Sequence, residues 1–177
     1  MKARFGMAML LALALLLTTI SFAQAQKGAA KAGVLNATEV GGKLFPDKVF
    51  FRGQVASVQA RNSGGVRFDD EMLVMAALVD ASGYASGIKE KYQGYLITEV
   101  AIDVNGQTLK PGAYGFGFVE NDKLVVMDLG ANDVFQASSK KDAELKHPVP
   151  LQFVAGSSAG TYRLYKGRDY VEIHRVK

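Results

Sequence analysis

The chain has no cysteine and no tryptophan among its 177 residues, and it has only two histidines. Without cysteine it can form no disulfide, no thiolate nucleophile, no cysteine zinc site and no covalent haem link. The lipid-bearing cysteine of bacterial lipoproteins is missing as well. Folding must therefore rest on the hydrophobic core alone, and no residue pattern predicts a cofactor.

A metal site is not predicted either. The two histidines, His147 and His174, are spaced unlike a pair of metal ligands. Acidic residues cluster at 69–71 and at 128–133, but neither cluster has the ligand spacing of a calcium loop. Solvated turns explain such clusters, because Asp and Asn side chains hydrogen-bond to their own backbone.

The charges are almost balanced, with 21 Lys and Arg against 17 Asp and Glu and a formal net charge of +4. Lys2 and Arg4 lie within the first 25 residues, so the remainder carries 19 basic against 17 acidic residues, a net of +2. Binding to nucleic acid requires basic side chains gathered on one surface, and here they are scattered along the sequence. A nucleic-acid partner is therefore not expected.

The first 25 residues have the pattern of a secretory signal peptide. Lys2 and Arg4 form a basic start, Met7–Leu17 is an apolar run, and Ala23 and Ala25 supply the small residues of a cleavage site. The run is shorter than the ~20 residues that a membrane-spanning helix needs, so we expect cleavage after Ala25 or Ala23 and no stable membrane anchor. The mature protein is predicted to be periplasmic or extracellular.

Removal of residues 1–25 leaves 177 − 25 = 152 residues, the size of one ordinary domain. Residues 26–43 are rich in Ala, Gly and Lys without clear periodicity, which predicts a flexible leader. The folded β-domain is expected to extend over 44–177, with order beginning near Leu44.

Alternating apolar and polar residues, separated by turn signals, predict an all-β fold. The period of two is clear over Tyr95–Val104, and the Asn105-Gly106 pair that follows favours a type I′ hairpin turn. Strands are further predicted at 49–60 (followed by a turn at Asn62–Gly65), 72–79, 113–119, 124–129, 151–155, 161–166 and 170–176. The expected architecture is an antiparallel β-sandwich or small β-barrel of eight or nine strands, without a helix of ten residues.

Residues Val104–Phe116 read Val-Asn-Gly-Gln-Thr-Leu-Lys-Pro-Gly-Ala-Tyr-Gly-Phe. This run resembles a signature of exported bacterial β-domains of unknown function: a hydrophobic residue, Asn-Gly, a polar residue, Leu, Pro or Ala, Gly, Thr or Ala, and Tyr. The resemblance implies an extracytoplasmic β-fold. It carries over no active site, since those families have no established activity.

One short segment matches the residue pattern of a hydrolase motif but lacks the secondary structure that the motif needs. Gly156–Gly160 matches Gly-x-Ser-x-Gly, which would make Ser158 a nucleophile on a turn between a strand and a helix. The residues that follow, Thr161–Tyr165, have the pattern of a strand, whereas the nucleophile turn needs a helix to support the oxyanion hole. We therefore expect an ordinary flexible turn at Ser158.

Two features point to ligand binding. In the strand 113–119, three aromatic residues alternate with Gly115 and Gly117, so one face of the strand is bare. That face either marks a bend covered by another part of the chain or forms the floor of a ligand groove. Tyr84, Tyr92 and Tyr95 lie close together in the sequence and could hold a sugar or a peptide, or they could be ordinary tyrosines.

The sequence favours a binding or interaction module for a small apolar, sugar or peptide ligand over an enzyme. The alternative is a hydrolase or lyase whose site combines distant residues such as Asp69, Glu71, His174 and Arg175. Convergence of His174 with two carboxylates within hydrogen-bond reach would favour the enzyme. A large apolar cavity would favour binding.

Overall fold

The structure, a computed structural model, describes residues 31–176. The described residues form fourteen strands and two helices of four residues each. The helices are α2 (Ala37–Val40) and α3 (Ser86–Lys89). The strands are β1 (Gly33–Leu35), β2 (Lys48–Phe51), β3 (Gln54–Arg67), β4 (Leu73–Val79), β5 (Gly94–Thr98), β6 (Ile102–Val104), β7 (Gln107–Leu109), β8 (Gly112–Val119), β9 (Lys123–Met127), β10 (Asp133–Ser138), β11 (Lys140–Lys141), β12 (Gln152–Ala155), β13 (Thr161–Lys166) and β14 (Asp169–Arg175).

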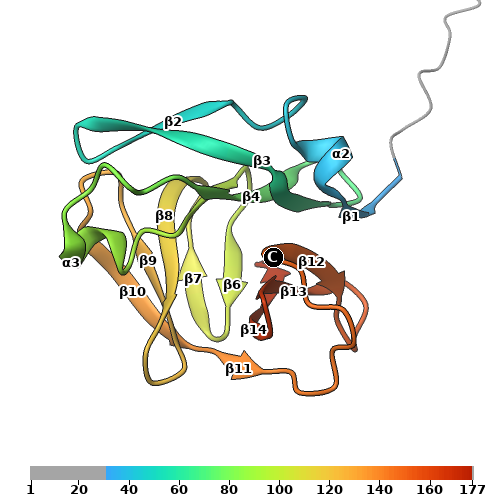
Figure 1. Cartoon of the computed structure of the whole chain (residues 1–177). Coiled ribbons are helices and arrows are strands. Elements are labelled where there is room, and N and C mark those ends of the chain that lie inside the picture. The colour runs from blue at the N-terminus through green and yellow to red at the C-terminus, as the bar shows by residue number, and fades with distance from the viewer. Residues whose placement is uncertain (1–30, 177) are drawn as a thin grey trace, which may run out of the picture.

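The strands form two antiparallel sheets that pack as a sandwich (Figure 1). The eight-stranded sheet has the order β1-β3-β4-β5-β8-β9-β10 with β2 added on β3, and the six-stranded sheet has the order β12-β13-β14-β6-β7 with β11 added on β14. The all-β prediction is confirmed, but neither sheet closes into a barrel. The expected count of eight or nine strands is wrong, because the predicted strands at 49–60 and 95–104 are each divided in two and the short strands β1, β7, β10 and β11 add to the count.

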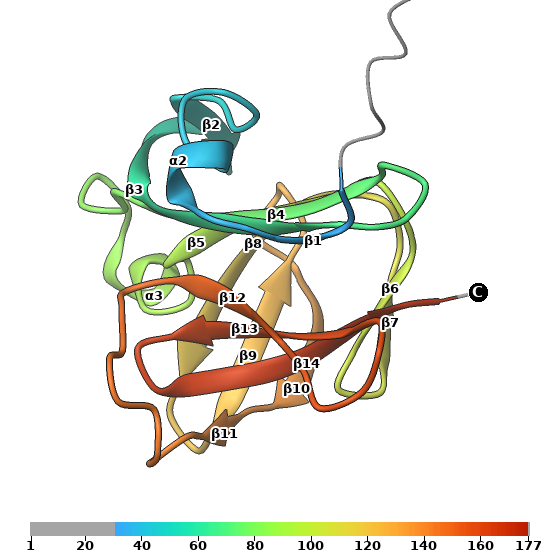
Figure 2. The same cartoon turned by 90° about the vertical axis from the view of Figure 1, so that its right-hand side faces the viewer.

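The main core lies between the two sheets. Alternation places Leu96, Phe116 and Val126 of the eight-stranded sheet against Leu164 and Ile173 of the six-stranded sheet, and each of these side chains is buried. Figure 2 shows the two layers edge-on, with β3 and β4 above β12, β13 and β14. The predicted strands at 151–155, 161–166 and 170–176 are confirmed and belong to the lower layer.

A second core covers the opposite face of the eight-stranded sheet. An outer layer packs on this face. It consists of the β2–β3 hairpin and α2, which Figure 2 shows above β4, and of the segment around α3, whose Tyr84, Ile88 and Tyr92 pack in the same second core. Phe51 and Tyr92 are both 0% exposed in this second core. The eight-stranded sheet is thus buried on both faces, which explains why Leu73–Val79 has a continuous apolar sequence rather than an alternating one.

Order begins before the predicted boundary at Leu44. β1 pairs with β3, and α2 follows with a complete capping box between Asn36 and Glu39. Leu35 and Val40 anchor this segment because they are 4% and 0% exposed. The expectation of a flexible leader is therefore wrong for residues 33–43. The signal peptide and residues 26–30 of the leader lie outside the described residues.

The predicted turn at Asn62–Gly65 is also wrong. These residues lie inside β3, and the hairpin turn is at Arg52-Gly53, where both residues have positive φ, 46° and 77°. A Cβ at Gly65 would approach the Val74 carbonyl oxygen to 2.7 Å, so the glycine is needed for close strand pairing. An irregularity between Val58 and Ser63 bends β3, which joins the outer layer to the eight-stranded sheet.

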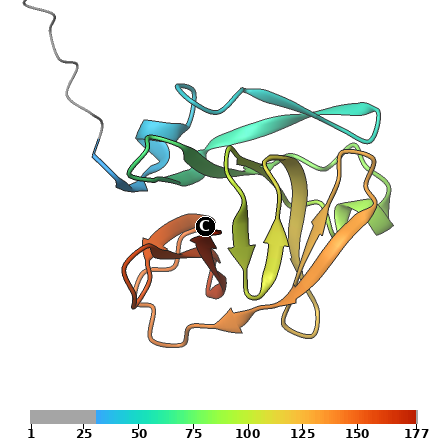
Figure 3. The same ribbon diagram turned by 180° about the vertical axis from the view of Figure 1, so that it is seen from behind.

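Tyr95–Val104 is divided between the two sheets. β5 belongs to the eight-stranded sheet and β6 to the six-stranded one, and the Thr98 hydroxyl donates to the Val100 carbonyl at the corner, at 2.6 Å. The alternation continues through the corner because Leu96 and Ile102 point into the same core. The predicted Asn105-Gly106 hairpin is confirmed and joins β6 to β7, beside β14 (Figure 3).

Candidate functional site

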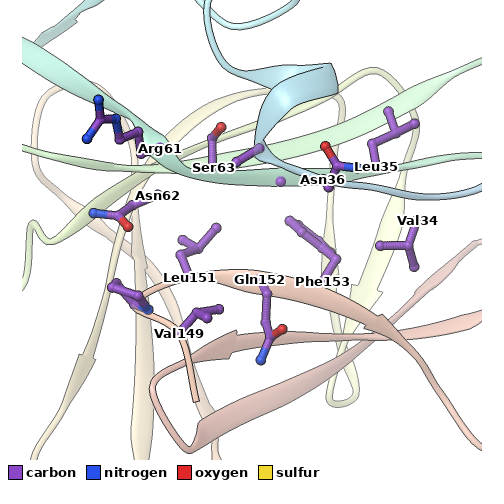
Figure 4. A pocket seen from close by; sticks show the side chains of 13 residues that line it. Val34, Leu35, Asn36, Arg61, Asn62, Ser63, Val149, Leu151, Gln152 and Phe153 are labelled. Carbon is purple, nitrogen blue, oxygen red and sulfur yellow. The ribbon is translucent and has the colours of Figure 1, made fainter. Parts of the chain in front are cut away.

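The candidate site is a cleft at the open side of the sandwich, where the edge of one sheet faces the edge of the other (Figure 4). Its volume is about 350 Å³. We call it the inter-sheet cleft. The upper wall comes from β1, the start of α2 and β3, and the lower wall comes from residues 149–153, which lead into β12. Three segments that are distant in the sequence therefore build it.

The walls of the inter-sheet cleft are apolar. Leu35, Leu151 and Phe153 are each 4% exposed, whereas Val34 and Val149 at the rim are 39% and 40% exposed. Figure 4 shows the Leu151 and Phe153 side chains rising from the lower wall toward β3. This lining can take up an apolar group.

Gly64 of β3 lies in the upper wall and faces the Phe153 ring of the lower wall. A Cβ at Gly64 would lie 3.3 Å from the Leu35 carbonyl oxygen and 3.4 Å from the Phe153 ring. The Phe153 ring therefore reaches Gly64 across the cleft, whereas the Leu35 carbonyl belongs to the same upper wall as Gly64.

The rim carries amides and one cation, and no Asp or Glu of residues 31–176 lines the cleft. The Asn36 amide oxygen caps α2 by accepting from the backbone N–H groups of Thr38 and Glu39, and the Ser63 hydroxyl donates to the Ala60 carbonyl. Arg61 is exposed and has no ion-pair partner within residues 31–176. The cleft therefore suits a neutral or acidic apolar ligand better than a basic one.

The backbone edges at the cleft are unpaired. Among residues 31–176, β1 pairs only with β3 and β12 pairs only with β13, so each is the end strand of its sheet. The peptide group of Leu151, just before β12, has no hydrogen-bond partner in the same part of the chain. An extended peptide could satisfy such backbone groups, whereas a hydrocarbon could not.

The predicted tyrosine site does not form an open surface. Tyr84, Tyr92 and Tyr95 are 7%, 0% and 6% exposed and belong to the core beneath the outer layer. The Tyr84 hydroxyl donates to the Phe51 carbonyl oxygen at 3.0 Å. Burial raises the pKa of all three phenols above the ordinary value. The rings of Tyr84 and Tyr92 pack against each other and against Phe51, and the Tyr95 ring packs against Phe45. All three tyrosines lie apart from the inter-sheet cleft.

The bare face of β8 is covered by the protein itself. A Cβ at Gly115 would meet the rings of Phe51 and Tyr92, and a Cβ at Gly117 would meet the carbonyl oxygen of Lys91. Of the two interpretations of this strand, the structure has the one in which another part of the chain covers the glycines. Neither glycine lines the floor of a groove.

Three of the residues named for an enzyme do share a cavity. Asp69, His174 and Arg175 line a hollow of about 450 Å³ at one end of the sandwich, and Glu71 is not among the lining residues. His174 Nδ1 lies 3.8 Å from the nearest Asp103 carboxylate oxygen, which is beyond hydrogen-bond reach. The convergence expected of a catalytic histidine with two carboxylates is therefore incomplete.

The charged side chains at this hollow are either held in an ion pair or exposed to solvent. The Arg175 guanidinium forms an ion pair with Asp70 and thereby holds the pKa of that carboxyl below its ordinary value. The His174 side chain is 52% exposed. Within the described part of the chain, no group of three His, Cys, Asp or Glu side chains could hold a metal ion.

Ser158 lies in the turn between β12 and β13, and its carbonyl oxygen accepts from the backbone N–H of Thr161. A strand follows this turn, as predicted, so the strand–turn–helix context of a hydrolase nucleophile is not formed.

No protein-family model, curated protein or solved structure matches the chain. The resemblance of Val104–Phe116 to exported bacterial β-domains therefore stays a prediction. In residues 31–176 no helix is long and apolar enough to cross a bilayer. The sequence missed the inter-sheet cleft, because its only local trace is the alternation of Val149, Leu151 and Phe153.

Proposed function

We propose that this protein is an exported binding module that holds an extended, apolar peptide segment of a partner in the inter-sheet cleft. The observation that carries the proposal is the cleft itself: an apolar hollow of about 350 Å³ between two end strands whose outer edges are unpaired within the described residues. Export rests on the signal-peptide pattern of residues 1–25, which is a prediction from the sequence.

A peptide fits the cleft better than a hydrocarbon of the same size. One or two aliphatic side chains of a peptide would contact Leu151, Phe153 and Val34, while its backbone could pair with the edge near Leu151. Recognition of this kind combines main-chain hydrogen bonds, which supply affinity, with side-chain pockets, which supply selectivity. The unpaired Arg61 at the rim would favour a segment that is neutral or acidic at this point.

The hydrolase or lyase alternative has less support. Asp69, His174 and Arg175 share a hollow, but the histidine lies 3.8 Å from its nearest carboxylate. Thr161 is its cross-strand partner in the same hollow, yet no side-chain hydrogen bond joins the two within residues 31–176. A binding role requires no such constellation.

The proposal is tested by selecting displayed random peptides on residues 26–177 and measuring the affinity of the enriched peptides by calorimetry. We expect the enriched peptides to carry alternating apolar side chains and few basic ones. Val149→Glu and Val34→Glu place a charge at the exposed rim of the cleft and should weaken binding at least tenfold, because a charge is costly to bury unpaired.

Val134→Glu is the matched control. Val134 lies in β10 and is 46% exposed, similar to the two rim valines, but it does not line the cleft. Its substitution should leave the affinity unchanged. The proposal fails if no peptide is enriched, or if all three variants weaken binding equally.

A further inference from the structure

The hairpin of β2 and β3 exposes two large apolar side chains side by side. Phe50 and Val55 are 55% and 62% exposed, and they are direct cross-strand partners in the hairpin register. No other large hydrophobic side chain of residues 31–176 is as exposed as either of them. The pair therefore stands out from the single exposed apolar residues that any protein surface carries.

The fold does not need these two residues to be apolar. Alternation turns Val49, Phe51 and Ala56 of the same hairpin toward the second core, where all three are buried. Phe50 and Val55 point the opposite way, at positions where an antiparallel hairpin with one buried face normally carries polar side chains.

The charge of the hairpin is positive. Lys48 lies two residues before Phe50 on the same face, Arg52 occupies the turn, and the hairpin residues 48–57 contain no Asp or Glu. Neither Lys48 nor Arg52 forms a side-chain ion pair within the described chain. The one acidic residue directly before the hairpin is Asp47.

We infer that the exposed face of the β2–β3 hairpin is a contact surface for an anionic lipid bilayer. An aromatic and an aliphatic side chain can enter the boundary between headgroups and acyl chains, while Lys48 and Arg52 are attracted to the anionic headgroups. Figures 1 and 2 show β2 on the outside of the molecule, on the opposite side of the eight-stranded sheet from β12–β14. Contact through β2 would leave the six-stranded sheet facing away from the bilayer.

A second copy of the chain fits this face less well. A twofold contact would place the same patch against itself, so that Lys48 and Arg52 would meet the like charges of the other copy. An anionic surface complements the same charges.

The test is co-sedimentation of residues 26–177 with phosphatidylcholine vesicles, with and without phosphatidylglycerol, at low and high salt. We expect weak, salt-sensitive binding to the anionic vesicles alone. The double variant Phe50→Ser/Val55→Ser and the double variant Lys48→Gln/Arg52→Gln should each lower the partition coefficient about tenfold, because one removes the inserted apolar area and the other the electrostatic attraction.

Val134→Ser and Lys166→Gln are the matched controls for these two double variants, since neither residue lies on the hairpin. Circular dichroism checks that each variant folds. Equal binding to both kinds of vesicle, no binding to either, or equal losses in the controls would overturn the inference. A dimer in sedimentation velocity that dissociates in the Phe50→Ser/Val55→Ser variant would also overturn it, since the patch would then be an interface between copies.

Discussion

The ring of Phe51 stacks on the ring of Tyr92, with the centroids 3.8 Å apart and the planes inclined by 11°. Phe51 comes from the β2–β3 hairpin and Tyr92 from the segment after α3, so the stack joins two parts of the outer layer. Both rings lie over Gly115 of β8. The two rings thus cover the bare face of β8, and they can lie this close because Gly115 has no side chain.

Gly115→Ala should destabilise the protein by about 1–3 kcal/mol, because the new methyl group would overlap the buried Phe51 ring. Gly87→Ala is the control, since Gly87 lies in α3 with nothing within 4 Å of its Cβ position. This control should be neutral or slightly stabilising. Urea unfolding measures both, and equal stability of the two variants would contradict the close contact.

Tyr92→Phe should leave the free energy of unfolding unchanged or raise it by up to about 1 kcal/mol. The Tyr92 hydroxyl is buried and has no hydrogen-bond partner in residues 31–176, so its removal costs no protein hydrogen bond. Tyr84→Phe is the counterpart, because it removes the hydrogen bond to Phe51 and should cost about 1 kcal/mol. A larger loss in Tyr92→Phe than in Tyr84→Phe would refute this ranking.

Stability in alkaline solution should depend on the Tyr92 phenol. Burial raises the pKa of Tyr92 in the folded state, so folding favours the protonated phenol. This contribution is fully present below the ordinary pKa of 10.0 and is lost as the pH rises above it toward the raised folded-state pKa. Tyr92→Phe should therefore lose less stability above pH 10 than the unmodified protein, as measured by thermal unfolding across this range.

Stability in acid should depend on the ion pair between Arg175 and Asp70. Because Arg175 lowers the pKa of Asp70 in the folded state, the pair stabilises the protein above the ordinary value of 3.8 and is lost as the pH falls below it. Asp70→Asn should show a flatter decline of the thermal midpoint over this window. Glu144→Gln is the control, since Glu144 forms no ion pair in the described chain; parallel curves for both variants would exclude the effect.

Asn105→Ala should destabilise the protein by about 2–3 kcal/mol and Asn105→Gly by about 1–2 kcal/mol. Asn105 has a φ of 47° in the hairpin turn, its amide oxygen accepts from Glu172 N–H, and its amide nitrogen donates to the Ser138 carbonyl. Glycine keeps the turn and loses only the side-chain bonds, whereas alanine loses both. Chemical denaturation separates the two contributions, and equal losses would show that the backbone conformation contributes little.

Where local chemistry set the conformation, the sequence was sufficient to predict it. Asn105-Gly106 formed its hairpin because these two residues tolerate positive φ, and the alternating apolar residues Leu96, Ile102 and Val104 all face the main core. Arg52-Gly53 was missed as a turn because arginine is uncommon at positive φ. The glycines at 64 and 65 were misassigned because close strand approach and tight turns select the same residue.

The candidate site could not be predicted from local sequence, because it depends on contacts between distant segments. Val34, Gly64 and Leu151 meet at the inter-sheet cleft only after two sheets have stacked, and no local pattern connects them. The tyrosines at 84, 92 and 95 became core residues because a hairpin from earlier in the chain folded over them. Side-chain alternation and turn preferences are properties of neighbouring residues, so the sequence by itself predicted the strands and the Asn105-Gly106 hairpin from them. Which strands share a sheet, and which faces are then covered or left open, followed from contacts between distant segments, because burial depends on what the rest of the chain places there.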